Sequence, residues 1–143
     1  MSGSSLEGKC LCGKVSVELE NPERHVEICQ CEMCRRWSGG FYSAQRGEHA
    51  SIQGEDSVVR FQSSDWGERA FCGTCGSHIW WRFLPTGSRS FSAGLFDAAI
   101  DHTIEREIFV DEGASWTTLA GDHPRQTGEE VIAEAKAAGY SFD

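Results

Sequence analysis

All seven cysteines of this chain lie in three short clusters: Cys10-Leu11-Cys12, Cys29-Gln30-Cys31-Glu32-Met33-Cys34 and Cys72-Gly73-Thr74-Cys75. Residues i and i+2 of a strand face the same side, so Cys10 and Cys12 can present both sulfurs to one ion. A C-x-x-C turn does the same for Cys72 and Cys75. Four thiolates complete a tetrahedral structural site, so we expect these two pairs to share one zinc ion.

The central cluster offers only three cysteines. Three protein ligands with a fourth, open position are typical of catalytic zinc, so we expect Cys29, Cys31 and Cys34 to hold a second, open or labile zinc ion. In the alternative, a fourth side chain closes the site and makes it structural. The candidates by residue type are His25, His49, His78, His102, His123, Glu27 and Glu32.

Disulfide bonds are the other use of clustered cysteines, and the sequence disfavours them. Seven is an odd number, and a C-x-C pair cannot form a disulfide without strain. Residues 1–7 lack the regions of a signal peptide, and no apolar run approaches the roughly 20 residues of a membrane span. We therefore expect a cytoplasmic protein with no membrane partner, in which thiols stay reduced.

Charge and length narrow the function classes further. The formal net charge is −9, from 13 basic and 22 acidic residues, so the chain is unsuited to binding a phosphate backbone, and we expect no nucleic-acid partner. The length of 143 residues predicts a single domain, 1–143, and we expect a monomer or homodimer.

The elements that must position the cysteines are mostly short strands. Apolar and polar residues alternate over 14–20, and turn residues separate this segment from other short apolar runs, which indicates a mostly antiparallel β domain. The further strands are expected at 26–31, 52, 58–62, 77–83, 90–95 and 107–110. Thr127 and Glu130 have capping-box spacing and predict a short C-terminal helix, and a helical turn is expected around 33–38.

Two arginines follow the central cluster directly. Arg35 and Arg36 are suited to binding a substrate carboxylate, but they equally fit a role in which they balance thiolate charge or pair with Glu32. Trp37 and Ser38 come next, and their proximity to the cluster makes them further candidates for substrate contacts.

These motifs resemble those of the glutathione-dependent formaldehyde-activating enzyme family, also called the centromere-protein-V domain family. The matching segments are 8–15, 29–39 and 71–77, with weaker similarity at 107–110 and Trp116. The resemblance covers about residues 8–116 and includes the order and spacing of all seven cysteines. One departure is Glu107, where similar proteins often have histidine.

The resemblance implies a β-tent fold of short antiparallel strands held by zinc. It also implies a structural zinc ion on Cys10, Cys12, Cys72 and Cys75, and a second zinc ion on Cys29, Cys31 and Cys34, which would then be the catalytic residues. Members of the family are usually described as carbon–sulfur lyases that act on the glutathione adduct of formaldehyde.

The leading hypothesis is therefore a zinc-dependent carbon–sulfur lyase that acts on a glutathione or other thiol adduct, such as S-hydroxymethylglutathione. In this hypothesis Arg35 positions a substrate carboxylate. The main alternative is a non-enzymatic β-tent zinc module that binds a protein partner, because fold does not determine function. A metal-storage or redox-sensing role is a third hypothesis.

Overall fold

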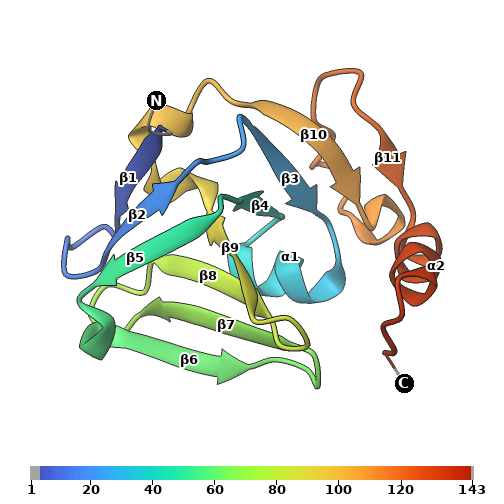
Figure 1. Ribbon diagram of the computed structural model, residues 1–143. Helices are drawn as coiled ribbons and strands as arrows, with labels where there is room; N and C mark the ends of the chain where they lie inside the picture. Colours follow the sequence, from blue (N-terminus) through green and yellow to red (C-terminus); the bar gives the residue numbers. More distant parts are fainter. Residues whose placement is uncertain (1–3, 143) are drawn as a thin grey trace. The chain divides into compact units, whose positions relative to one another are not determined.

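The computed structural model describes residues 4–142 and is built mainly from β-strands (Figure 1). The chain forms two compact units. Unit 1 comprises the residues up to 24 and residues 44–102, and unit 2 comprises residues 25–43 and the chain from 103 onward. The four-cysteine set predicted from the sequence lies in unit 1 and the central trio in unit 2. The single-domain organisation expected from the sequence stays a prediction.

Unit 1 contains a three-stranded antiparallel sheet of β1 (Ser5–Lys9), β2 (Ser16–Glu20) and β5 (His49–Gln53), with β2 in the middle. Its sequence explains which face is buried. Val17 and Leu19 alternate with polar residues along β2, and both are almost fully buried. One face of this small sheet is therefore apolar and must pack against other elements of the unit.

The other strands of unit 1 form an antiparallel series in the order β4, β9, β8, β7 and β6. Their bounds are β4 (Tyr42–Gln45), β6 (Val58–Gln62), β7 (Gly67–Cys72), β8 (His78–Phe83) and β9 (Ser88–Ser92). The end of β4, Ala44 and Gln45, pairs with β9. Three 3₁₀ turns complete the unit: η1 (Glu55–Ser57), η2 (Ala93–Leu95) and η3 (Asp97–Ala99).

The core of unit 1 joins these two sets of strands. Trp80 and Phe91 lie at its centre, are at most 1% exposed, and meet edge to face with ring centroids 6.3 Å apart. Side chains of β1, β2 and the 3₁₀ turns pack on the same cluster, which also contains two cysteines: Leu6, Cys10, Val15, Val17, Leu19, Ala70, Cys72, Ile79, Leu95, Phe96 and Ala99. The two cysteines are thus part of the core as well as possible ligands.

Unit 2 has a parallel sheet in which β10 (Thr103–Ile108) lies between β3 (His25–Cys29) and β11 (Arg125–Gln126). Its helices are α1 (Glu32–Ser38), the 3₁₀ turn η4 (Val110–Glu112) and α2 (Gly128–Ala137). The parallel pairing departs from the antiparallel arrangement expected for most strands. The connection from β3 to β10 contains β4 to β9 and is long enough for a parallel crossover.

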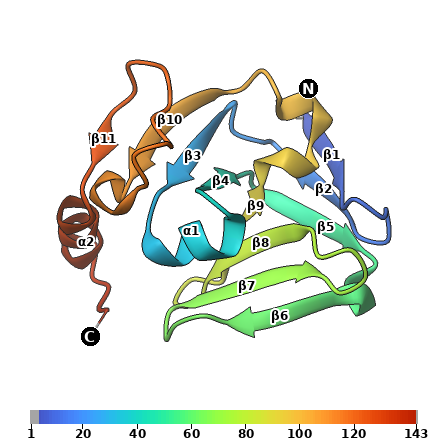
Figure 2. The ribbon, with the colours of Figure 1, turned by 180° about the vertical axis from the view of Figure 1, so that it is seen from behind.

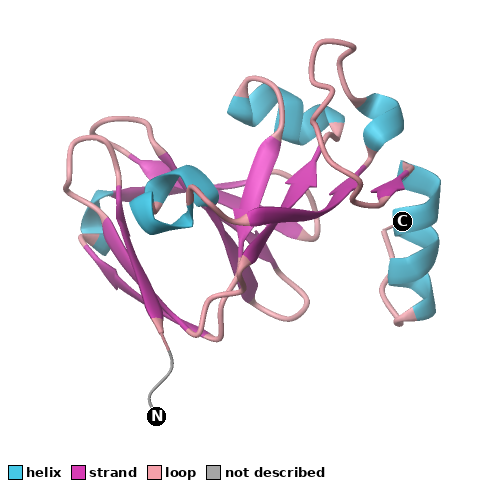
Figure 3. Cartoon of the chain, turned by 90° about the horizontal axis from the view of Figure 1, so that it is seen from above, coloured by secondary structure: helices cyan, strands magenta, loops and turns pink. Residues whose placement is uncertain are grey.

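The structure confirms the mainly β fold with a short C-terminal helix, and strands make up most of the regular structure (Figure 3). The predicted capping box begins α2: the Thr127 hydroxyl accepts from the Glu130 N–H at 3.2 Å, and the Glu130 carboxylate accepts from the Thr127 N–H at 2.9 Å. The predicted helical turn at 33–38 is α1. In the part of the chain that the structure describes, no helix has the length and apolar character of a membrane span.

Candidate metal centres

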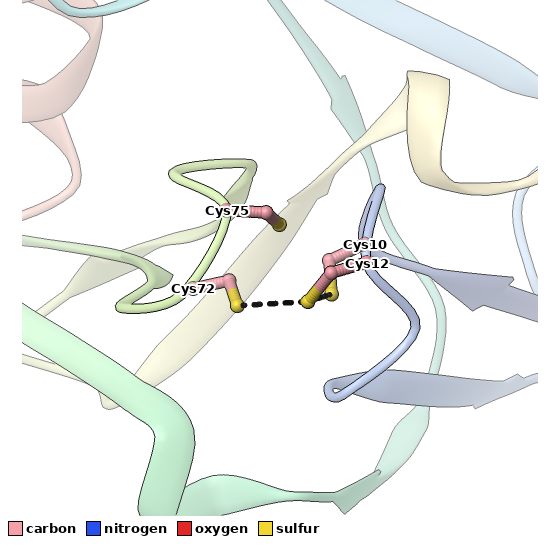
Figure 4. Close-up of side chains that lie close together, drawn as sticks. All are labelled: Cys10, Cys12, Cys72 and Cys75. Atoms are coloured by element: carbon pink, nitrogen blue, oxygen red, sulfur yellow. Dashed lines mark hydrogen bonds between the residues drawn. The ribbon is translucent and has the colours of Figure 1, made fainter.

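The four-cysteine cluster lies in unit 1 and consists of Cys10, Cys12, Cys72 and Cys75. All four sulfurs lie within 4.8 Å of one another. Figure 4 shows the turn after β1 and the turn after β7 presenting their cysteines to the same point. The two turns are 60 residues apart in sequence, yet the sulfurs of Cys12 and Cys72 are 3.8 Å apart. The structure therefore brings together the two cysteine pairs that sequence spacing suggested.

Each of the two cysteine turns contains a glycine with a left-handed backbone. Gly13 has φ of 83° and Gly76 has φ of 80°, a conformation that a side chain would strain. Backbone bonds close the turns: Gly13 N–H donates to the Cys10 carbonyl at 3.1 Å, and Gly76 N–H donates to the Cys72 carbonyl at 2.8 Å. A third residue, Ser77, connects the turns, because its hydroxyl accepts from the Leu11 N–H at 3.0 Å. The sulfurs are thus held in place by backbone geometry.

The sulfur positions fit a tetrahedral metal ion. A zinc–sulfur bond of about 2.3 Å places tetrahedral sulfurs about 3.8 Å apart. The observed Sγ separations are 3.6 Å for Cys10 and Cys12 and 3.8 Å for Cys12 and Cys72. A hydrogen bond with the Ser77 hydroxyl lowers the pKa of Cys75 to about 5, so this cysteine favours the thiolate that metals bind. The donor set therefore fits a closed four-sulfur site.

The three-cysteine cluster lies in unit 2 and consists of Cys29, Cys31 and Cys34. Cys29 ends β3, Cys31 is the N-cap of α1, and Cys34 is buried in the first turn of that helix, a path that Figures 1 and 2 show from opposite sides. Their sulfurs lie within 4.8 Å of one another. The Cys31 sulfur also accepts a hydrogen bond from the Cys34 N–H at 3.4 Å. A strand end and a helix start thus converge on one point.

The neighbouring thiols of the trio affect the protonation of Cys29. Hydrogen bonds with Cys31 and Cys34, together with burial, raise the pKa of Cys29, since a thiolate there would crowd two others. A divalent cation offsets that repulsion. The donor set of three converging thiols therefore also fits a metal ion.

No fourth ligand joins the trio among residues 4–142, where the cluster contains no His, Asp or Glu. Several of the candidates for that place contact other groups. His25 pairs with Glu105 at 2.6 Å, His102 bonds Gln45 at 2.8 Å, His123 bonds Glu107, Glu27 pairs with Arg106 at 2.6 Å, and Glu32 pairs with Arg36. The arrangement resembles a three-ligand site more than a closed one.

The residues that follow the three-cysteine cluster differ in whether their polar atoms have partners. Arg36 is exposed and pairs with Glu32 one turn earlier, which is the charge-pairing role. The Nε of Arg35 and the hydroxyl of Ser38 are buried, and neither has a hydrogen-bond partner in the described residues. The ring of Trp37 packs at a tilt on Tyr42, with centroids 5.5 Å apart. Of the two arginines, only Arg35 has a buried donor without a partner among the described residues.

A buried polar network lies directly behind the three-cysteine cluster. Gln30, between two of the cysteines, donates to the Glu107 carboxylate at 3.3 Å and to the Thr117 carbonyl at 3.2 Å. Glu107 in turn contacts His123 and pairs with Arg125 at 3.0 Å. The side chains of Glu107 and His123 are at most 5% exposed. This network fixes the segment that carries the cysteines.

Sequence reasoning missed this network, although it had singled out Glu107. The carboxylate has an imidazole partner in His123, which lies 16 residues later and outside the segments that resemble the family. Gln30 and Glu107 are 77 residues apart. The sequence did contain one signal of the network: Glu107 begins an otherwise apolar strand segment, 107–110. A carboxylate buried in such a strand requires hydrogen-bond or ion-pair partners, so partners elsewhere in the chain could have been expected.

Comparison with known proteins agrees with the cysteine geometry. The sequence profile of the family described as glutathione-dependent formaldehyde-activating enzyme matches residues 5–112, most of the chain and all seven cysteines. The chain belongs to this family. The match confirms the resemblance found in the sequence, and it ends before His123 and α2.

Three individual proteins are similar to this chain, each at 31% sequence identity or less. An uncharacterized lyase of Schizosaccharomyces pombe is 27% identical over 128 residues, covering 88% of this chain and 93% of the relative. A Halomonas elongata protein, named provisionally as a glutathione-dependent formaldehyde-activating enzyme, is 31% identical over 85 residues, covering 52% of this chain and 54% of its own length. A crystal structure of a Rhodobacter sphaeroides protein covers 84% of this chain and 99% of its own, with a TM-score of 0.55 and 18% identity, which shows similarity of fold.

Proposed function

We propose that this protein is a zinc-dependent carbon–sulfur lyase acting on a thiol adduct such as S-hydroxymethylglutathione. The observation that carries the proposal is the three-cysteine cluster, which has three converging sulfurs and no fourth ligand among residues 4–142. The family match and the lyase and formaldehyde-activating names of two relatives support enzymatic activity on a glutathione-related substrate.

The chemistry requires a site that accepts a thiol. In the lyase direction the carbon–sulfur bond of the hydroxymethyl adduct breaks, the carbon leaves as formaldehyde, and the hydroxyl proton passes to the sulfur. Cys29, Cys31 and Cys34 would hold a zinc ion, which would supply a Lewis acid that stabilises the substrate thiolate at neutral pH. The four-cysteine cluster would hold a separate structural ion.

The residues of α1 supply substrate contacts in this proposal. The guanidinium of Arg35 follows the ligand Cys34 directly and keeps a buried donor without a partner in the described chain. A carboxylate is the ligand that a guanidinium binds best. Ser38 offers a second unused polar atom, and Trp37 an apolar surface, from the same short helix. Because the cysteine ligands must stay reduced, the proposal includes a cytoplasmic location.

The proposal is tested by the rate of exchange between formaldehyde, glutathione and their adduct, followed by NMR exchange spectroscopy on zinc-loaded protein. The adduct forms without an enzyme, so the expected result is an added rate proportional to protein concentration. Cys31→Ser removes a ligand of the trio and should abolish that added rate. No acceleration by the zinc-loaded protein, or an undiminished rate with Cys31→Ser, would sink the proposal.

Two neighbouring arginines provide a matched test of substrate binding. Arg35→Gln should raise the KM for the glutathione adduct about tenfold, because a charged hydrogen bond is lost. Arg36→Gln removes the same charge at an exposed position that already pairs with Glu32, and it should change KM less than about twofold. Equal effects of the two substitutions would mean that Arg35 makes no specific contact.

A further inference from the structure

One large aromatic side chain of unit 2 is left in solvent. Trp116 is 71% exposed, whereas the other four tryptophans, all within the described residues, are buried or partly buried. It follows the 3₁₀ turn η4 and lies in the same unit as the three-cysteine cluster. Leaving an indole in water forgoes the free energy of burial, and tryptophan is among the residues that contribute most to binding.

The turn that carries Trp116 is bonded to Gln30, the residue between Cys29 and Cys31. The Gln30 amide donates to the Thr117 carbonyl at 3.2 Å, and the Thr117 hydroxyl donates to the Gln30 amide oxygen at 3.0 Å. Thr117 is only 7% exposed. The segment that holds two of the three cysteines therefore also fixes the backbone next to Trp116.

The indole lies at the C-terminal end of α1. Gly40 is buried, and a methyl carbon placed on it would lie 3.5 Å from the Trp116 ring, so the ring rests against this glycine. Two residues earlier is Ser38, whose buried hydroxyl has no partner among residues 4–142. The exposed indole and a polar atom assigned above to substrate binding thus belong to the same end of the helix.

The length of α1 separates this end from the cysteines. The helix has seven residues, so its two ends lie about 10 Å apart. The three-cysteine cluster lies at the N-terminal end and Trp116 at the other. An extended tripeptide spans about 10 Å, whereas a single amino acid spans about 3.5 Å. A thiol adduct bound at the cluster therefore needs the length of a peptide to reach the indole.

We propose that Trp116 contacts the substrate and selects adducts of peptide thiols over adducts of single-amino-acid thiols. The indole stacks on a planar amide of the peptide, and both surfaces lose water. Because the turn is fixed before the ligand arrives, binding costs little loss of backbone freedom there. This inference rests on the lyase function proposed above and adds to it a residue that determines specificity.

The structural rival is that Trp116 only covers Gly40. That rival predicts a lower melting temperature when Trp116 is replaced, with no change in the affinity for ligands. Melting curves and affinities must therefore be measured on the same variants. A contact with substrate predicts a loss of affinity for peptide ligands alone, which a purely structural role would not produce.

The experiment is isothermal titration calorimetry of zinc-loaded protein with S-methylglutathione and S-methylcysteine. Neither probe has a free thiol, so neither tests the capture of a thiolate by zinc, and the two differ in peptide length. The variants are Trp116→Ala and Trp116→Phe. Phe61→Ala is the control, because Phe61 is an aromatic residue that is 63% exposed on β6 of unit 1.

We expect the wild-type protein and Phe61→Ala to bind S-methylglutathione more tightly than S-methylcysteine. Trp116→Ala should weaken the binding of S-methylglutathione about tenfold, and Trp116→Phe, which keeps a ring, less than about threefold. The affinity for S-methylcysteine should stay the same in all variants. Absence of S-methylglutathione binding to the wild-type protein, or equal affinities of the wild-type protein and Trp116→Ala, would overturn the inference.

Quenching of tryptophan fluorescence by acrylamide tests the contact without any substitution. Saturating S-methylglutathione should reduce the quenching of the wild-type protein, because it covers the exposed indole. Unchanged quenching would overturn the inference even if Trp116→Ala failed to fold. The exchange rate of the formaldehyde adduct is measured separately. Acceleration together with affinities that do not depend on Trp116 would refute only this inference, whereas absence of acceleration would refute the lyase function.

Discussion

The two cysteine clusters use the same ligand type in different settings. In the four-cysteine cluster, Cys10 and Cys72 are at most 2% exposed and belong to the apolar core of unit 1. In the three-cysteine cluster, the sulfurs come from a strand end and a seven-residue helix, and a polar network of Gln30 and Glu107 lies behind them. One cluster is built into the core, whereas the other is held by hydrogen bonds.

The different settings of the two clusters suit a metal bound by cysteines to two different roles, one in folding and one in catalysis. Two turns 60 residues apart meet at the four-cysteine cluster, so a metal there contributes directly to folding. The three-cysteine cluster spans only six residues, from 29 to 34, so a metal bound there would close a short loop and would contribute less to stability. Substitutions in each cluster should therefore have unlike consequences.

The largest effect is expected from Cys10→Ser and Cys72→Ser. Structural zinc contributes about 10–16 kcal/mol in zinc-finger peptides, which is comparable with the whole stability of a domain, about 5–15 kcal/mol. These variants should lose cooperative thermal unfolding or aggregate, as measured by circular dichroism. A melting curve like that of the wild-type protein would show that the four-cysteine cluster has no structural role.

Cys31→Ser should have a much smaller effect on folding. The variant should keep the wild-type circular dichroism spectrum and melt within a few degrees of it, while bound zinc falls from about two ions per chain to about one. Elemental analysis of the purified variant measures the zinc. If Cys31→Ser melted as early as Cys72→Ser, the division of roles between the clusters would be wrong.

The network behind the trio should show an intermediate effect. Glu107→Ala leaves the buried His123 without its carboxylate partner and removes the partner of the exposed Arg125, and it should cost about 3 kcal/mol in urea unfolding. It should also weaken zinc binding by the three-cysteine cluster, because Gln30 loses a partner. Glu105→Ala is the control, since that carboxylate is 46% exposed, and it should cost less than about 1 kcal/mol. Equal costs would mean that the network does not support the site.

The smallest effect is expected from Thr127→Ala, which removes the capping box of α2. Loss of an N-cap hydroxyl costs about 1 kcal/mol, so the urea midpoint should fall slightly. Bound zinc should stay at the wild-type value, because α2 supplies no cysteine to either cluster. A loss of zinc in this variant would show that the three-cysteine cluster responds to any destabilisation of unit 2.

Local patterns in the sequence predicted much of this structure. β6 occupies 58–62 as expected, and the capping box of α2 was readable because its two residues are three apart. The alternation over 14–20 located β2, although the regular strand begins only at Ser16. The strand β1, at residues 5–9, was missed because Gly8 and charged residues weaken its pattern.

The features that the sequence did not reveal depend on contacts between distant segments. The parallel pairing of β3 with β10 and the partners of Glu107 both require strand register, which local spacing does not determine. Trp116 shows the same limit. Tryptophan side chains are usually largely buried, but 71% of this residue is exposed.

The most direct test of the division between the clusters is the zinc content per chain before and after dialysis against glutathione, with the fold followed by circular dichroism. We expect about two zinc ions to fall to about one while the spectrum stays unchanged, because the thiol would compete only for the metal of the three-cysteine cluster. Two ions that both remain, or that leave together as the protein unfolds, would contradict it.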